Sequence, residues 1–193
     1  MHKTLSYYEN NAKHLSQRYE SAKVDNIHSL LLNIFPPKSY LLEIGCGSGR
    51  DAAFMYRNGY DILAIDGSRE MIAEAKQCHP ELAGCLEVMK IPDELHFEPS
   101  FFDGVYCIAT LMHLDKSGID QTIEKVATVL KAGSKFLFSV SVQRDDVDDQ
   151  GKDVVISCNV ACPHFPKICQ YDIFLSLNHF FYYNASILSR SRL

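Results

Sequence analysis

The glycine-rich turn Gly45-Cys46-Gly47-Ser48-Gly49 most constrains the fold, because it joins the apolar run Tyr40–Ile44 to a helical stretch. Such a turn places bare backbone amides and the positive end of a helix dipole at the carboxyl edge of a sheet. Glycine suits it because the chain turns sharply and a Cβ would hold a ligand away from the backbone. The turn therefore predicts an α/β fold with a ligand site at this edge.

Short apolar runs alternate with helical stretches on both sides of this turn. The expected strands are residues 40–44, 61–65, 85–89, 104–109 and 135–141, and the expected helices are residues 50–57, 68–78 and about 119–130. Gly133 is predicted to be the C-cap of the last helix. This alternation indicates a Rossmann-like, doubly wound, mostly parallel sheet with helices on both faces.

The chain outside this core has weaker patterns. Apolar residues spaced by three and four before Pro36-Pro37 predict an N-terminal extension of one or two amphipathic helices. Five aspartates within residues 143–153 predict a solvated loop. Residues 154–160 and 178–188 could be strands, and residues 168–177 a helix. We expect a single domain, residues 1–193, with a helical lid (1–35), a cofactor-binding core (36–142) and a divergent C-terminal segment (143–193).

Composition narrows the class of protein. A formal net charge of −5 with scattered Lys and Arg predicts no nucleic-acid partner. The polar N-terminus and the lack of a long apolar run predict neither a secretion signal nor a membrane span. Seven cysteines in unrelated contexts fit reduced thiols, so we expect a cytoplasmic protein. The oligomeric state is not readable.

Asp66 supplies the second half of the predicted site. It ends the next expected strand, 17 residues beyond Gly49 (66 − 49), where its carboxylate can accept hydrogen bonds from both hydroxyls of a ribose. Dinucleotide-binding turns favour G-x-G-x-x-G, which cradles a pyrophosphate, whereas this turn is G-x-G-x-G with Glu43 two residues upstream. A nucleoside ligand is therefore predicted.

These motifs resemble the class I S-adenosylmethionine-dependent methyltransferases, in particular a small-molecule, type 11-like methyltransferase domain. Residues 64–71, 102–105 and 130–134 are similar to the family's second, fourth and fifth strand motifs, and the resemblance runs from about residue 7 to 142. It implies S-adenosylmethionine as cofactor, whereas the Cys and His spacings of the chain predict no metal site. The residues implied to bind the methionine moiety are Glu43, Gly45, Cys46, Gly47 and Gly49. Those implied for the ribose and adenosine are Asp66, Gly67, Ser68 and Met71. The family's usual acidic residue after the third strand is replaced by Met89-Lys90-Ile91, with Asp93 as the nearest carboxylate.

Candidates for the acceptor side follow the fourth strand or lie near the N-terminus. His113 could take a proton from a substrate hydroxyl or amine, or it could only pack and cap the following turn. Thr110, Tyr7, Tyr8 and Tyr19 are candidate substrate contacts, although periodic tyrosines on an amphipathic helix also suit a core. Cys158, Cys162, His164, Cys169 and His179 match no ordinary zinc spacing.

The resemblance implies an enzyme that methylates a small-molecule acceptor and releases S-adenosylhomocysteine. The absence of Asn-Pro-Pro-Tyr or Asp-Pro-Pro-Tyr after the fourth strand removes the usual signature of amino-nitrogen methylation on nucleobases and glutamine. Two alternatives stay open: a non-catalytic S-adenosylmethionine-binding regulatory or partner protein, and a nicotinamide-dinucleotide-binding protein.

Overall fold

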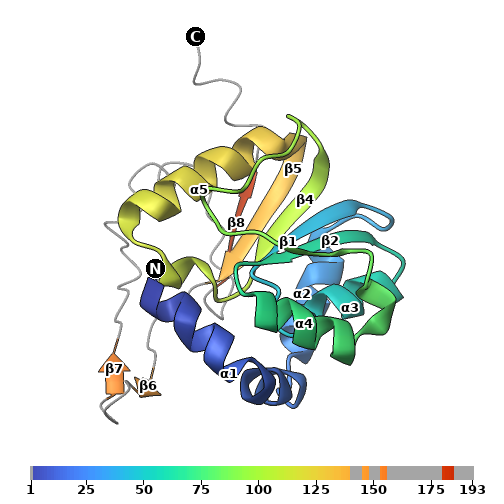
Figure 1. Ribbon diagram of the computed structural model, residues 1–193. Coiled ribbons are helices and arrows are strands. Elements are labelled where there is room, and N and C mark those ends of the chain that lie inside the picture. The colour runs from blue at the N-terminus through green and yellow to red at the C-terminus, as the bar shows by residue number, and fades with distance from the viewer. Residues whose placement is uncertain (1, 140–144, 148–152, 156–179, 185–193) are drawn as a thin grey trace.

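The computed structural model describes residues 2–139, 145–147, 153–155 and 180–184 (Figure 1). The helices are α1 (His2–Glu20), α2 (Asp25–Ile34), α3 (Arg50–Arg57), α4 (Arg69–Cys78) and α5 (Lys116–Val129), with 3₁₀ turns η1 (Pro80–Leu82) and η2 (Leu111–His113). The strands are β1 (Tyr40–Ile44), β2 (Asp61–Asp66), β3 (Leu86–Val88), β4 (Phe102–Cys107), β5 (Leu130–Ser139), β6 (Asp145–Val147), β7 (Asp153–Val155) and β8 (Phe180–Asn184).

Within these residues the main sheet has the order β3-β2-β1-β4-β5-β8. All its neighbouring pairs are parallel except β5 and β8, which pair antiparallel. The strand order reverses between β1 and β4, which makes the sheet doubly wound and opens a crevice at the carboxyl ends of these strands. The predicted fold class is confirmed.

Alternate residues of β1 pack into two different cores. Leu42 and Ile44 lie in the cluster that includes Val126 and Val129 of α5. Leu41 lies in the cluster that includes residues of α2, α3 and α4. Because successive side chains of a strand point to opposite faces, α5 covers one face of the sheet, and α2, α3 and α4 cover the opposite face (Figure 1).

The N-terminal extension is two helices, and α1 packs against α4. Ala12 and Leu15 of α1 form a small buried cluster with Met71 of α4. Ser68 caps α4 by accepting a hydrogen bond from the Met71 amide at 3.2 Å. The packing of Ala12 and Leu15 against Met71 holds α1 beside the sheet edge that carries the glycine turn.

The prediction for Gly133 is wrong. Helix α5 ends at Val129, and Leu130 already pairs with Phe102 of β4. The next pair is Gly104 with Lys135, so residues 131–134 bulge out of β5. Gly133 has φ +83 in this bulge, a conformation that glycine adopts without strain. Buried strand pairing therefore ends the helix before the glycine is reached.

The C-terminal segment departs in part from expectation. The predicted loop 143–153 contains β6, which pairs antiparallel with β7 through backbone hydrogen bonds that do not depend on side-chain polarity. The expected strand at 178–188 is present as β8, at 180–184. The possible helix at 168–177 and all five residues of the rejected zinc set lie outside the described residues.

Replacing Ser16 with alanine is expected to stabilise the protein. Ser16 of α1 is fully buried, and among the described residues its hydroxyl has no hydrogen-bond partner. Removing an unsatisfied buried hydroxyl and gaining helix propensity should raise the free energy of unfolding by about 1 kcal/mol, measured by urea denaturation. The control is Ser6→Ala, at an exposed position of the same helix. Equal gains from both changes would show that burial of the Ser16 hydroxyl has no cost.

Candidate functional site

A cavity of about 470 Å³ lies at the carboxyl edge of the sheet, between α1 and the loops that follow β1, β2 and β4. This volume is in the range of small-molecule sites. The predicted site residues that line it are Tyr8, Tyr19, Glu43, Gly45, Cys46, Gly47, Asp66, Gly67, Thr110 and His113. Tyr7, Gly49, Ser68 and Met71 are not among its lining residues. Tyr7 is 44% exposed, whereas Met71 is buried against α1.

The glycines of the turn are required by its geometry. Gly45 has φ +75, and a Cβ added there would lie 2.1 Å from Thr110 Oγ1. Gly49 has φ +82 and precedes α3 as its N-cap. A side chain at Gly45 would therefore be strained and would collide with the wall formed after β4.

The Gly45, Cys46 and Gly47 amides of the turn already have hydrogen-bond acceptors, which corrects the sequence prediction of bare amides. The Gly45 and Cys46 amides donate to the Ile65 carbonyl at 2.7 and 3.0 Å. The Gly47 amide donates to Asp66 Oδ2 at 3.0 Å. The pairing of β1 with β2 continues into the turn and uses these donors. Beside the turn, the carboxyl groups of Glu43 in β1 and Asp66 in β2 line the cavity, an arrangement that suits ammonium and hydroxyl groups better than phosphates.

Asp66 is held from both sides. Its Oδ2 accepts from the Gly47 amide, and its Oδ1 accepts from the Ser68 amide at 2.9 Å. Burial raises the pKa of Asp66 despite these two hydrogen bonds, and the charge of Glu9 adds to the rise. Because a carboxylate oxygen has two lone pairs, each oxygen keeps one for a ligand hydroxyl.

Glu43 is a buried carboxyl group in the cavity wall. It is 2% exposed, and Tyr106 donates its hydroxyl to Glu43 Oε2 at 3.1 Å. Burial raises the pKa of Glu43 well above its usual range and nearby Asp51 raises it further, whereas the Tyr106 hydrogen bond and Arg50 act in the opposite direction. The positive charge of a ligand group would stabilise the ionised form of Glu43 in this buried position.

Another part of the cavity wall is formed by residues of α1 and η2. The Tyr8 hydroxyl and His113 Nε2 are hydrogen bonded at 3.0 Å, and their rings meet edge to face. Thr110 donates its hydroxyl to the Ile108 and Gly45 carbonyls at 3.2 and 3.4 Å. Burial, followed by the proximity of Tyr8, raises the pKa of Tyr19, so this phenol stays protonated. Tyr8 and His113 are the titratable groups that this wall joins by a direct hydrogen bond.

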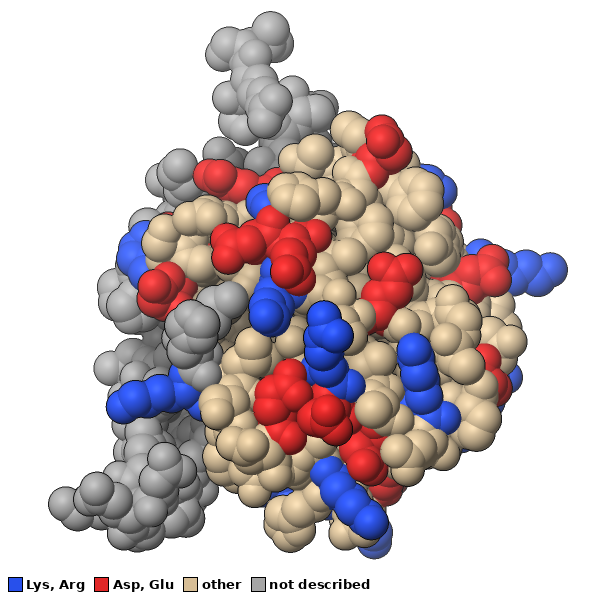
Figure 2. Space-filling view, viewed as in Figure 1, with Lys and Arg blue, Asp and Glu red and all other residues tan. Residues whose placement is uncertain are grey.

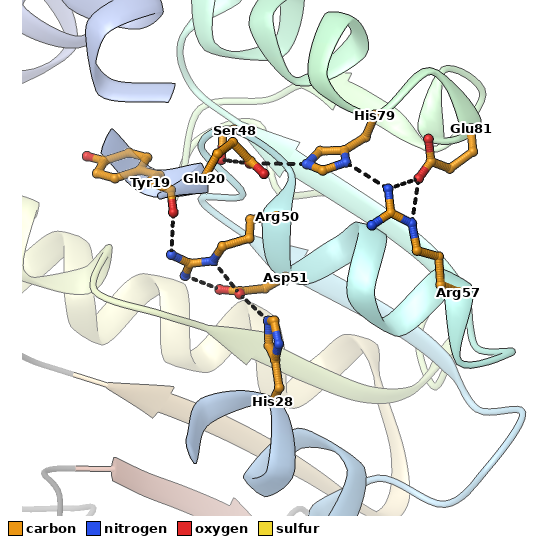
Figure 3. Close-up of polar contacts among 9 residues, drawn as sticks. All are labelled: Tyr19, Glu20, His28, Ser48, Arg50, Asp51, Arg57, His79 and Glu81. Atoms are coloured by element: carbon orange, nitrogen blue, oxygen red, sulfur yellow. Dashed lines mark hydrogen bonds and ion pairs between the residues drawn. The ribbon is translucent and has the colours of Figure 1, made fainter. Parts of the chain in front are cut away.

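The sequence analysis gave no role to Arg50 and Asp51, although both directly follow the turn. Arg50 pairs with both oxygens of Asp51, and Asp51 also accepts from His28 Nε2 at 2.9 Å (Figure 3). Burial would raise the pKa of Asp51, but the His28 and Arg50 hydrogen bonds lower it. Asp51 therefore stays ionised, and its negative charge raises the pKa of Glu43. The sequence feature that could have identified these two residues is a basic and an acidic side chain directly after the glycine turn.

Three further lining residues come from the stretch that lacks the family's acid. Met89, Lys90 and Ile91 border the cavity beside Gly67, whereas Asp93 does not line it. A Cβ on Gly67 would lie 3.4 Å from Leu5 and 3.6 Å from Lys90 Cγ, so this wall is narrow. Apolar surface and the Lys90 stem, rather than a carboxylate, form this end of the cavity.

Two kinds of feature are missing from the part of the chain that the structure describes. Its His, Cys, Asp and Glu side chains form no group of three or more arranged to hold a metal ion. None of the described helices has the length and apolar character needed to cross a membrane.

Comparisons with known proteins agree with this geometry. A family model described as a methyltransferase domain matches residues 41–133. A ubiquinone biosynthesis O-methyltransferase of Aliivibrio fischeri is 30% identical over 102 residues, covering 51% of this chain and 42% of that protein. An 18S rRNA (guanine-N(7))-methyltransferase of Schizosaccharomyces pombe is 32% identical over 76 residues, covering 39% of this chain and 28% of that protein. The match thus spans less than half of either relative.

Among solved structures, the PH0226 protein of Pyrococcus horikoshii has a TM-score of 0.67 with 18% identity. The match covers 86% of this chain and 92% of that one. At this identity the likeness shows a shared fold.

Proposed function

We propose that this chain, whose residues 41–133 match a methyltransferase domain, is a class I S-adenosylmethionine-dependent methyltransferase that methylates a small-molecule acceptor and releases S-adenosylhomocysteine. The observation that carries the proposal is the distribution of donors and acceptors around the cavity. Glu43 suits the cofactor's ammonium group, and Asp66 suits its ribose hydroxyls. The occupied amides of Gly45, Cys46 and Gly47 disfavour a pyrophosphate and hence a nicotinamide dinucleotide.

The remaining predicted cofactor residues take different places in this proposal. Gly45 and Gly47 line the cavity beside the methionine moiety, and the buried Cys46 lines it between them. Gly67 borders the adenosine, with Met89 and Ile91 as apolar neighbours of the base. Gly49, Ser68 and Met71 support this wall from behind by starting α3, capping α4 and packing under α1.

Methyl transfer needs little covalent chemistry from the protein. When bound, the sulfonium supplies both the methyl group and the leaving group, so the protein positions and desolvates the acceptor. We propose that His113 accepts the proton that the acceptor hydroxyl or amine loses as its bond to the methyl carbon forms. Tyr8 orients the His113 ring through their hydrogen bond, and Thr110 and Tyr19 shape the space beside it.

A small molecule is the favoured acceptor because α1 covers the cavity and contributes Thr4, Leu5 and Tyr8 to its wall. On the face seen in Figure 2, basic and acidic residues of the described part are interspersed rather than sorted into a basic surface. The rRNA methyltransferase among the relatives keeps an RNA acceptor as the competing outcome. Turnover assays with panels of small hydroxyl and amine compounds and with RNA would separate the two. Cofactor binding without any turnover would favour a non-catalytic binding protein.

We also propose that the protein works in the cytoplasm. Among the residues that the structure describes, Cys46, Cys78, Cys85 and Cys107 form no disulfide. Burial raises the pKa of Cys46 well above its usual range, so this thiol beside the cofactor stays protonated and unreactive.

Replacing Asp66 with alanine is expected to weaken S-adenosylhomocysteine binding by about 1.5 to 3 kcal/mol, because charge-assisted hydrogen bonds to the ribose are lost. Isothermal titration calorimetry measures this. The control is Asp61→Ala, at the exposed opposite end of β2. Unchanged affinity in the Asp66 variant would remove the ribose assignment, and binding of NADH by the native protein would favour the dinucleotide alternative.

A further inference from the structure

The C-terminal end of α1 is fastened to the glycine turn by side chains that the proposed chemistry does not use. We propose that Glu20 is a positioning residue, which anchors α1 to this turn and thereby holds Tyr8 and Tyr19 against the cavity. The inference rests on the proposed function in that the cavity is taken as the site of the cofactor and the acceptor. The anchoring of α1 itself does not depend on any ligand.

The first fastening is a carboxylate shared by two donors. Glu20 Oε1 accepts from Ser48 Oγ at 2.6 Å and from His79 Nε2 at 3.1 Å (Figure 3). Ser48 and His79 are 1% and 5% exposed, so both donors are taken from water when they meet Glu20. Ser48 belongs to the glycine turn and His79 follows α4, so one side chain joins three separate segments.

The tautomer of His79 is set by its other neighbour. Arg57 NH2 lies 3.2 Å from His79 Nδ1, and a guanidinium can only donate hydrogen bonds. His79 Nδ1 must therefore accept, which leaves the proton on Nε2, where it points to Glu20. Arg57 is in turn paired with Glu81. The imidazole is thus a fixed donor rather than a freely orienting one.

A second fastening acts on the neighbouring residue of the helix. Arg50 NH1 donates to the Tyr19 carbonyl at 3.0 Å while Asp51 holds the rest of its guanidinium (Figure 3). A cation suits the carbonyl end of a helix, but an acidic side chain such as Glu20 in the last turn opposes the helix dipole. The charge of Glu20 therefore does not stabilise α1 through the helix dipole. Its hydrogen bonds are instead made to Ser48 and His79, outside α1.

The junction lies directly beside Tyr19 and Gly47, which line the cavity. The Tyr19 ring lies 3.4 Å from where a Cβ of Gly47 would be, and His79 Cδ2 lies 3.4 Å from the equivalent point on Gly49. Tyr8 precedes Glu20 by about three helical turns, so a tilt of α1 at Glu20 carries Tyr8 away from His113. At that far end Glu9 accepts from the Arg69 and Glu70 amides at 2.9 and 3.4 Å in exposed contacts. The polar contacts of Glu20 thus use buried partners, whereas those of Glu9 are exposed.

The test compares Glu20→Ala with Glu20→Gln by amide hydrogen exchange of the ligand-free full chain. Glutamine keeps an oxygen that can accept from Ser48 and His79, whereas alanine removes it. We expect amides of residues 2–20 to exchange about tenfold faster in the alanine variant, with most of the protection restored in the glutamine variant. Exchange in β1 and β4 should not change. The charge-matched control is Glu98→Ala, at an exposed position in the loop before β4.

The same variants are then measured with S-adenosylhomocysteine. We expect its dissociation rate to rise about tenfold in Glu20→Ala and little in Glu20→Gln. Faster exchange in β1 and β4 would show that Glu20→Ala unfolds the whole chain. In that case the Ser48→Ala variant, which removes only one of the two donors to Glu20, is used in place of Glu20→Ala in both measurements. Unchanged exchange of residues 2–20 in a folded Glu20→Ala or Ser48→Ala protein would overturn the proposal. Failure of the native protein to bind the ligand would overturn the proposed function alone.

Discussion

Replacing Gly45 with alanine is expected to lower the free energy of unfolding by about 2 to 5 kcal/mol and to weaken S-adenosylhomocysteine binding by roughly 100-fold or more. At φ +75 the added Cβ is strained, and it would lie 2.1 Å from Thr110 Oγ1 and 2.4 Å from Thr110 Cγ2. Relief requires either the turn or the segment after β4 to move, and both line the cavity. Urea denaturation and calorimetry measure the two effects.

Gly59→Ala separates the two causes. Gly59 has φ +82, but nothing lies within 4 Å of an added Cβ, so this change carries the backbone cost without the collision. Adding Thr110→Ala to Gly45→Ala removes the two shortest contacts and should restore part of the lost stability. The double-mutant cycle then gives the coupling between the two positions. If Gly45→Ala costs no more than Gly59→Ala, close packing against Thr110 is not what requires glycine in the turn.

Local patterns were enough to predict much of the fold. The turn glycines and Asp66 follow from residue type and spacing along a strand–turn–helix unit, which involves only neighbouring residues. The alternation of apolar and helical stretches likewise predicted the parallel sheet. Each of these signals is contained within a short segment, so it can be read before any tertiary contact is known.

The features that sequence reasoning missed depend on contacts between distant segments. Occupation of the Gly45 amide depends on its partner Ile65 in the neighbouring strand, and the register between two strands is not written in either one. The hydrogen bond from Tyr8 to His113 spans 105 residues. Gly133 shows the same limit, since the pairing of Leu130 with Phe102 overrides the glycine as a helix end.

Glu43 combines a predictable position with a property that only the structure reveals. The family resemblance, which rests in part on its place two residues before the turn, implies contact with the cofactor's amino-acid end. Its burial beside Asp51, with Tyr106 as hydrogen-bond donor, adds that the ionised form is costly in the ligand-free protein. Under the proposed function, cofactor binding and the stability of the ligand-free protein therefore make opposite demands on this side chain.

Glu43→Gln is accordingly expected to stabilise the ligand-free protein by about 1 to 2 kcal/mol at neutral pH while weakening S-adenosylhomocysteine binding by about 3 kcal/mol, or roughly 150-fold. The folded-state pKa of Glu43 lies above its ordinary value of about 4.5, so the folded chain binds more protons than the unfolded chain between these two values. The native free energy of unfolding therefore falls as the pH rises through this window. Glutamine has no proton to lose and escapes that fall.

Denaturation of both proteins from pH 4 to 8 tests the sign. The two free energies of unfolding should converge at the acid end, where Glu43 is protonated and resembles glutamine, and diverge toward neutral pH. Glu87→Gln, at an exposed position of β3, controls for the loss of one negative charge and should track the native protein throughout. Parallel curves for Glu43→Gln and the native protein would mean that Glu43 titrates normally. Tight ligand binding by Glu43→Gln would instead mean that the cofactor's ammonium group has another partner, and the burial of Glu43 would then need a different explanation.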